Sequence, residues 1–222
     1  MTKIEDKFVT GEIVEEIESR ILGKLSPMAI SGDIRDGNDI SSGALPIKRA
    51  FGSGALAIGD TYTEAWGTGA LAYGSNCVAS GDWSIAAGGN SLAGGSKSSA
   101  IGHGTSAIST ASHAEGYRTI AEGSYAHAEG NVTKARGTAS HTEGDNTSAN
   151  GNKSHAEGEN TQAIGIASHA EGSGTIANGY GQHAAGKYNI ADTNDTYVEI
   201  VGNGGQYSGR SNARTLDWNG NA

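Results

Sequence analysis

The feature that most constrains this chain is a glycine at every seventh position. Stepping by seven from Gly67 to Gly186, seventeen of the eighteen positions are glycine, and Ser109 is the exception. Glycines held in one register belong to a repeated structure and not to a flexible linker. Collagen is excluded because it needs glycine at every third position and abundant proline, whereas only two of the 222 residues are proline.

The residues around each glycine favour short β-strands over a helical heptad. Coiled coils need large apolar residues at two heptad positions, but these heptads carry Gly, Ser, Thr and Asn. Alanine stands two positions before the glycine from Ala65 to Ala184, with Thr142 as the exception, and a small residue stands four positions before it. Residues two apart share one face of a strand, so the small residues face inward and the variable ones outward. We expect the glycine to make the turn at positive φ.

The complete repeat is fourteen residues long, because two kinds of heptad alternate. From residue 112, units such as S-H-A-E-G alternate with units such as T-I-A-E-G. Each coil then has two short strands and two turns, and about ten coils between residues 50 and 186 give a rod of roughly 45 Å. The sequence therefore predicts an all-β solenoid over residues 51–190. Its core is so thin that we expect several chains to pack together.

The paired Ser-x-Ala-x-Gly units resemble the head domains of trimeric autotransporter adhesins. The resemblance covers roughly residues 50–190. It implies a left-handed parallel β-roll and a homotrimer, neither of which the period alone establishes.

The first 27 residues predict a short amphipathic helix. Thr10 is the expected N-cap, and one stripe of the helix carries Ile13, Ile17, Ile21 and Leu25. We expect this stripe to pack against its copies in a trimer or against a docking partner. Residues 28–50 contain turn signals and are interpreted as a connector.

Residues 191–222 predict a β-rich segment of a different kind. The run from Tyr197 to Val201 is β-rich, and the sequence R-S-N-A-R-T-L-D-W-N-G-N-A follows it. This segment resembles phage tail-fibre and neck-appendage proteins just before a C-terminal intramolecular chaperone that cleaves itself off. The resemblance implies that a chaperone domain follows this segment, so that Ala222 is either a cleavage end or a truncation, and it favours a phage protein over a bacterial adhesin.

Two rows of ionisable residues repeat at fourteen-residue spacing. They are His113, His127, His141, His155, His169 and His183, and Glu115, Glu129, Glu143, Glu157 and Glu171. Stacked carboxylates about 4.8 Å apart repel one another, so the two rows must neutralise each other or a cation must lie between them. We expect a His–Glu ladder between chains. Metal binding by the same residues and plain solvent exposure are the alternatives.

Composition excludes several classes of function. The net charge of −9 argues against nucleic-acid binding. The sequence contains no run of 18 apolar residues, so it does not predict a membrane-spanning helix. The common catalytic motifs for hydrolases, metalloproteases and nucleotide binding are missing, so we expect neither enzymatic activity nor a cofactor. Trp66, Tyr73 and Trp83 are predicted at outward strand positions, as interface or sugar-stacking residues.

The sequence thus predicts a homotrimeric phage tail fibre or receptor-binding protein of the virion. It would mount on other tail or baseplate proteins through its N-terminus and bind a host surface receptor by multivalent contact. The alternatives are the head of a bacterial surface adhesin and a purely structural spacer of the tail.

Overall fold

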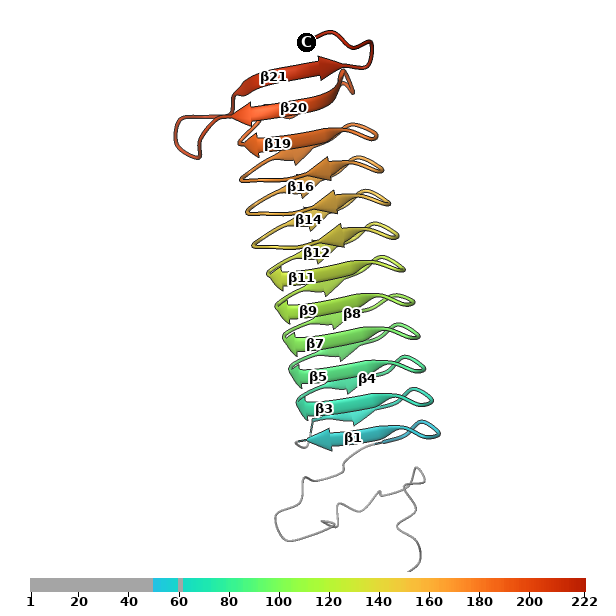
Figure 1. The fold of residues 1–222 in the computed structure, drawn as a ribbon. Coiled ribbons are helices and arrows are strands. Elements are labelled where there is room, and N and C mark those ends of the chain that lie inside the picture. The colour runs from blue at the N-terminus through green and yellow to red at the C-terminus, as the bar shows by residue number, and fades with distance from the viewer. Residues whose placement is uncertain (1–49, 60–61) are drawn as a thin grey trace, which may run out of the picture.

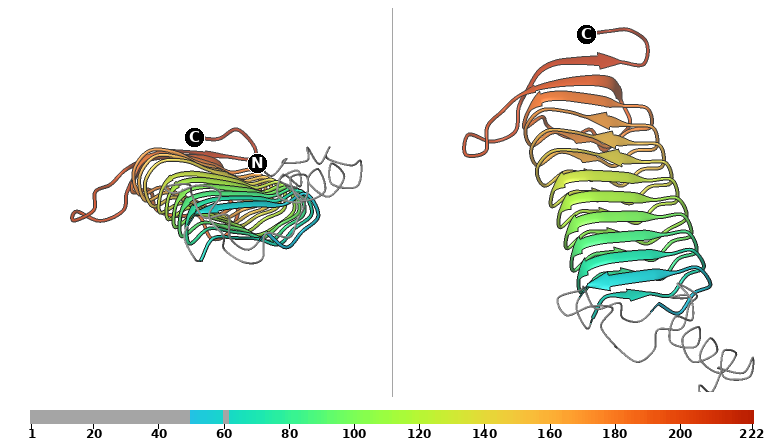
Figure 2. Two further views of the ribbon diagram at one scale, coloured as in Figure 1. Left: turned by 90° about the horizontal axis from the view of Figure 1, so that it is seen from below. Right: turned by 60° about the horizontal axis from the view of Figure 1, so that its bottom comes forward.

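A computed structural model describes residues 50–59 and 62–222 and shows a parallel β-solenoid. Successive coils stack into a rod in which two sheets lie back to back (Figures 1 and 2). The described ranges contain no α-helix, and hence no helix that could span a membrane. The predicted helix stripe Ile13, Ile17, Ile21 and Leu25 lies outside the described residues.

The longer sheet, called the long sheet below, has twelve strands. Its order is β1-β3-β5-β7-β9-β11-β13-β15-β17-β19-β20-β21. The bounds are β1 Leu56–Gly59, β3 Leu71–Ser75, β5 Ile85–Gly89, β7 Ser99–His103, β9 His113–Tyr117, β11 His127–Asn131, β13 His141–Thr142, β15 His155–Ala156, β17 His169–Ala170, β19 His183–Lys187, β20 Tyr197–Asn203 and β21 Asn212–Asp217.

The shorter sheet contains nine strands of two residues each. They are β2 Glu64–Ala65, β4 Val78–Ala79, β6 Leu92–Ala93, β8 Ser106–Ala107, β10 Ile120–Ala121, β12 Lys134–Ala135, β14 Ser148–Ala149, β16 Gln162–Ala163 and β18 Ile176–Ala177. Its neighbouring strands are parallel and pair at a spacing of fourteen residues, as in Ile120 with Lys134, and the long sheet has the same spacing from β3 to β19, as in His113 with His127. The predicted fourteen-residue coil is confirmed. In the first coil Leu56 pairs with Leu71, so that coil carries one extra residue.

The core between the sheets is a column of alanines with serines and threonines. The alanines two positions before the repeat glycines, such as Ala128, are fully buried. Thr142 is equally buried, and it divides the alanine column into two clusters, one ending at Ala135 and one starting at Ala149. Its hydroxyl has no hydrogen-bond partner. An alanine side chain buries little apolar area, so backbone hydrogen bonds between coils supply much of the order.

The repeat glycines have two structural roles. In one set, those that end the long-sheet units, φ is positive, as in Gly130 at +103°. In the other set φ is not positive, but the coils touch: a Cβ on Gly137 would lie 1.9 Å from the carbonyl oxygen of Gly151. Gly130 has the same conflict, at 2.3 Å from the oxygen of Gly144. The predicted positive-φ turn therefore holds for one set, while close stacking excludes a side chain in both.

A second left-handed row stands two residues after each repeat glycine. Its non-glycine members have φ between 42° and 60°: Asn76, Trp83, Asn90, Lys97, Ala111, Arg118, Tyr125, Val132, Ala139, Asn146, Lys153, Asn160, Ala167 and Tyr188. Their backbone N–H groups bond the preceding coil, as Val132 N does to Tyr117 O at 2.8 Å. Trp83 belongs to this turn row, so its prediction as an outward strand residue was wrong.

The C-terminal end of the rod closes with a change of strand direction. Strand β20 pairs in parallel with β19 and antiparallel with β21. Asp192 holds the loop before β20 by accepting hydrogen bonds from the backbone N–H groups of Asn194, Thr196 and Tyr197 at 3.0, 2.6 and 2.8 Å. Gln182 takes a core position that smaller residues fill elsewhere, and its Nε2 donates to the carbonyl of Tyr197 at 2.8 Å.

Candidate functional site

The outer face of the long sheet carries two continuous rows of side chains. From β9 to β19 each strand of this sheet begins with a predicted histidine, and the predicted glutamates stand two residues after the first five of these histidines. The strand register continues the same rows into mostly apolar residues in the first coils. Leu56, Leu71, Ile85 and then Ser99 precede the histidines, and Ile58, Tyr73, Ala87 and Ile101 precede the glutamates. The structure therefore brings all eleven predicted ionisable residues onto one face, next to an exposed apolar surface.

The histidine rings stack along the rod. Ring centroids lie 4.7–4.8 Å apart from His127 to His169, with planes within 9° of parallel. His169 and His183 are 5.1 Å apart. His113 breaks the pattern, because its ring stands at 88° to that of His127 with the centroids 4.9 Å apart. Rings at this spacing cannot all carry a positive charge without strong repulsion.

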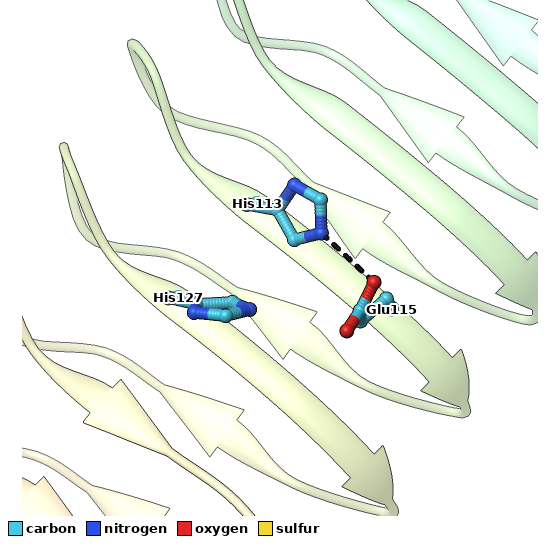
Figure 3. Close-up of side chains that lie close together, drawn as sticks. All are labelled: His113, Glu115 and His127. Carbon is cyan, nitrogen blue, oxygen red and sulfur yellow. Dashed lines mark hydrogen bonds and ion pairs between the residues drawn. The ribbon is translucent and has the colours of Figure 1, made fainter.

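The histidines approach glutamates of the same chain. His113 Nε2 lies 3.3 Å from Glu115 Oε2 (Figure 3), and His127 Nε2 lies 3.8 Å from Glu129 Oε2. Farther along, the partner changes to the preceding coil: His169 Nε2 lies 3.4 Å from Glu157 Oε1. His183 Nε2 lies 3.3 Å from Glu171 Oε1 in the same way. Contacts that the sequence led us to expect between chains thus already form within one chain.

Most of these imidazoles have no hydrogen-bond partner for Nε2. The Nε2 atoms of His127, His141, His155, His169 and His183 are shielded from solvent and have no hydrogen-bond partner. At His169 and His183 the carboxylate is near enough, but the angle is unsuitable for a hydrogen bond. Partial burial, together with the neighbouring histidines, lowers the pKa of His127, His155 and His169. An unprotonated Nε2 at these positions offers its lone pair to a ligand.

The glutamate row lines an open groove of about 480 Å³, whose floor includes the glycines of the long-sheet turns. Carboxylates in adjacent coils compete for protons. Sharing a proton with Glu143 raises the pKa of Glu129, and the same neighbour raises the pKa of Glu157 to about 6. The pKa of Glu115 is lowered, chiefly by its hydrogen bond with His113. The raised pKa values of Glu129 and Glu157 reflect the close packing of carboxylates along the row, which makes ionisation of every member costly.

A second groove, of about 460 Å³, lies beside the shorter sheet and the C-terminal loop. Its guanidinium groups already have partners. Arg136 lies 3.4 Å from Glu122 and donates to Asn150 at 2.9 Å. Arg210 donates to the carbonyls of Gly174 and Asn189. These cations serve the fold, so the groove is a weaker candidate for a charged ligand than the His–Glu face.

The predicted aromatic residues separate into two environments. Tyr73 is half-exposed on the long sheet, in the apolar part of the glutamate row. Trp66 lies on the shorter sheet and stacks on Phe51, with ring centroids 4.0 Å apart, and its Nε1 donates to Glu64. The structure therefore does not gather these residues into one sugar-stacking platform.

Comparison with protein-family models and with curated proteins finds no match to this chain.

Proposed function

We propose that this chain is the rigid shaft or head of a homotrimeric phage tail fibre that attaches the virion to its host. The observation that carries the proposal is the outer face of the long sheet. Its two rows are apolar over the first three coils, carry Ser99 and Ile101 in the fourth, and hold His and Glu over the next five, whereas the shorter sheet mixes charged, polar and apolar residues. A uniform face along a whole rod is suited to contact with copies of itself.

The thin core supports self-association. The alanine column leaves large apolar side chains outside the roll: Tyr73, Ile85 and Ile101 are each 40–51% exposed on this face. Packing three rods together by this face would bury them. The three-chain assembly and the left-handed winding are part of the proposal and come from the resemblance to adhesin heads. The His–Glu face would then lie at the interface between chains.

The remaining parts of the proposal follow from the ends of the chain. The N-terminal region would mount the fibre on other tail or baseplate proteins, and the rod would present a host receptor with three parallel copies of one surface. The segment from Tyr197 onward resembles tail-fibre proteins, which favours a virion over a bacterial cell surface. An adhesin head and a structural spacer are the competing functions.

Attachment is tested with labelled, purified protein and whole cells of the bacterium in whose genome or phage the gene lies. The proposal predicts saturable binding that blocks adsorption of the phage. Tail genes beside this gene would support the phage assignment, whereas a membrane anchor in the same reading frame would support the adhesin. If these cells bind no more protein than unrelated bacteria do, the attachment function is contradicted and the structural spacer is the remaining candidate.

A further inference from the structure

We propose that the His–Glu face binds divalent transition-metal ions at three sites, each built by two adjacent coils. The sites are His113–Glu115–His127, Glu129–His141–Glu143 and His155–Glu157–His169. In each group, one ligand atom per residue lies within 4.8 Å of the others. All three groups form within one chain, so the inference does not rest on the proposed trimer.

The distances are close to those that a bound ion requires. Metal–ligand bonds of about 2.0–2.1 Å in a tetrahedral site place neighbouring ligand atoms about 3.3–3.4 Å apart. The His113–Glu115 contact is 3.3 Å, and the His169–Glu157 contact is 3.4 Å. These separations already match one edge of the tetrahedron. The third ligand of each group also lies within 4.8 Å and closes on the ion by rotation of its side chain, while the backbone stays in register.

The first site needs the smallest rearrangement. Parallel stacked imidazoles direct their lone pairs side by side, so two of them converge on one ion only after a ring turns. The rings of His113 and His127 already stand at 88°, with Glu115 beside them (Figure 3). We therefore expect this site to bind most tightly. The Glu129–His141–Glu143 site, with one nitrogen, should bind most weakly.

The donor set selects the class of metal. Imidazole nitrogen combined with carboxylate suits Zn²⁺, Co²⁺, Ni²⁺ and Cu²⁺, whereas Ca²⁺ and Mg²⁺ prefer oxygen ligands alone. Three ligands leave at least one coordination position for water or for a group from another molecule. The unpartnered Nε2 atoms and the crowded carboxylates would both gain a partner from such an ion.

The test uses the full chain without a histidine tag, stripped of metal by a chelator and titrated with Zn²⁺ by calorimetry. Co²⁺ titration provides a visible absorption spectrum that reports nitrogen ligation. We expect up to three ions per chain. In the double variant His113→Gln/His127→Gln, the Zn²⁺ affinity of the tightest site should fall at least tenfold. His103→Gln is the matched control, because His103 stacks on Tyr117 outside the three groups.

Circular dichroism of each variant establishes that the fold is retained. The inference is overturned if the wild type takes up no Zn²⁺, if the double variant binds as much as His103→Gln, or if Ca²⁺ competes equally well. A monomer that binds three ions would contradict the trimer while supporting the metal sites. A trimer that binds no metal ion would support the proposed assembly and contradict the metal sites.

Discussion

Substituting the stacked glycines should destabilise the rod in an order that the geometry fixes. At Gly130 an alanine meets two penalties, since φ is +103° and its Cβ would lie 2.3 Å from the oxygen of Gly144. Left-handed strain costs about 1–3 kcal/mol and overpacking about 1–3 kcal/mol, so Gly130→Ala should cost about 2–6 kcal/mol. Gly137→Ala meets only the steric penalty, 1.9 Å from the oxygen of Gly151, and should cost about 1–3 kcal/mol.

The matched control is Gly104→Asn. Gly104, at φ +68°, belongs to the left-handed row that accepts asparagine elsewhere, and a Cβ there meets nothing nearer than 3.5 Å. The free energy of unfolding of this variant should differ from that of the wild type by less than about 0.5 kcal/mol. The assay is guanidinium unfolding followed by circular dichroism. Repeat proteins often unfold in stages, so midpoints are compared across the series. A Gly130→Ala variant as stable as Gly104→Asn would refute the stacking argument.

Three further substitutions test other parts of the fold. Val132 is a β-branched residue at φ 57° in the left-handed row. Val132→Asn should therefore stabilise the protein by about 1 kcal/mol and raise the melting temperature by roughly 2–4 °C. An unchanged or lower melting temperature would contradict this expectation. Thr142→Val keeps the shape but removes the buried, unpartnered hydroxyl, so the free energy of unfolding should rise by about 1 kcal/mol, and a fall would mean that the hydroxyl has a partner. Burial alone would raise the pKa of Asp192, but three backbone N–H donors lower it overall. Its stabilisation is therefore complete above the unfolded pKa of about 3.9 and lost as pH falls through the folded value. Asp192→Ala should cost about 2–4 kcal/mol at pH 7 and less in acid, and a loss independent of pH would exclude the charge as the cause.

The solenoid could be predicted because the residue types that recur in the repeat each fit only one structural role. Alanine at one phase fills a column that admits only a methyl group, and glycine at another marks the point where coils touch. The first coil keeps the parallel pairing although it is one residue longer, as the pairing of Leu56 with Leu71 shows. Two strands per coil and the fourteen-residue spacing followed from these patterns.

The left-handed turn row could not be predicted in the same way. It contains Lys, Val and Trp beside Asn and Gly, so residue type alone does not identify the conformation at each position, and Trp83 was assigned to a strand. The register of the face was predictable, because residues fourteen apart must stack. The change of glutamate partner between His127 and His169 was not, because it depends on side-chain rotation and not on spacing.

The central claim, that the rods associate by the outer face of the long sheet, is tested most directly by sedimentation equilibrium. The account predicts a mass three times the 22.4 kDa of one chain. Tyr73→Glu, which places a charge in the apolar rows, should reduce that mass to one chain, whereas Tyr180→Glu, at an exposed position outside both rows, should leave the trimer intact. A wild-type protein that sediments at the mass of one chain at micromolar concentration would contradict the account.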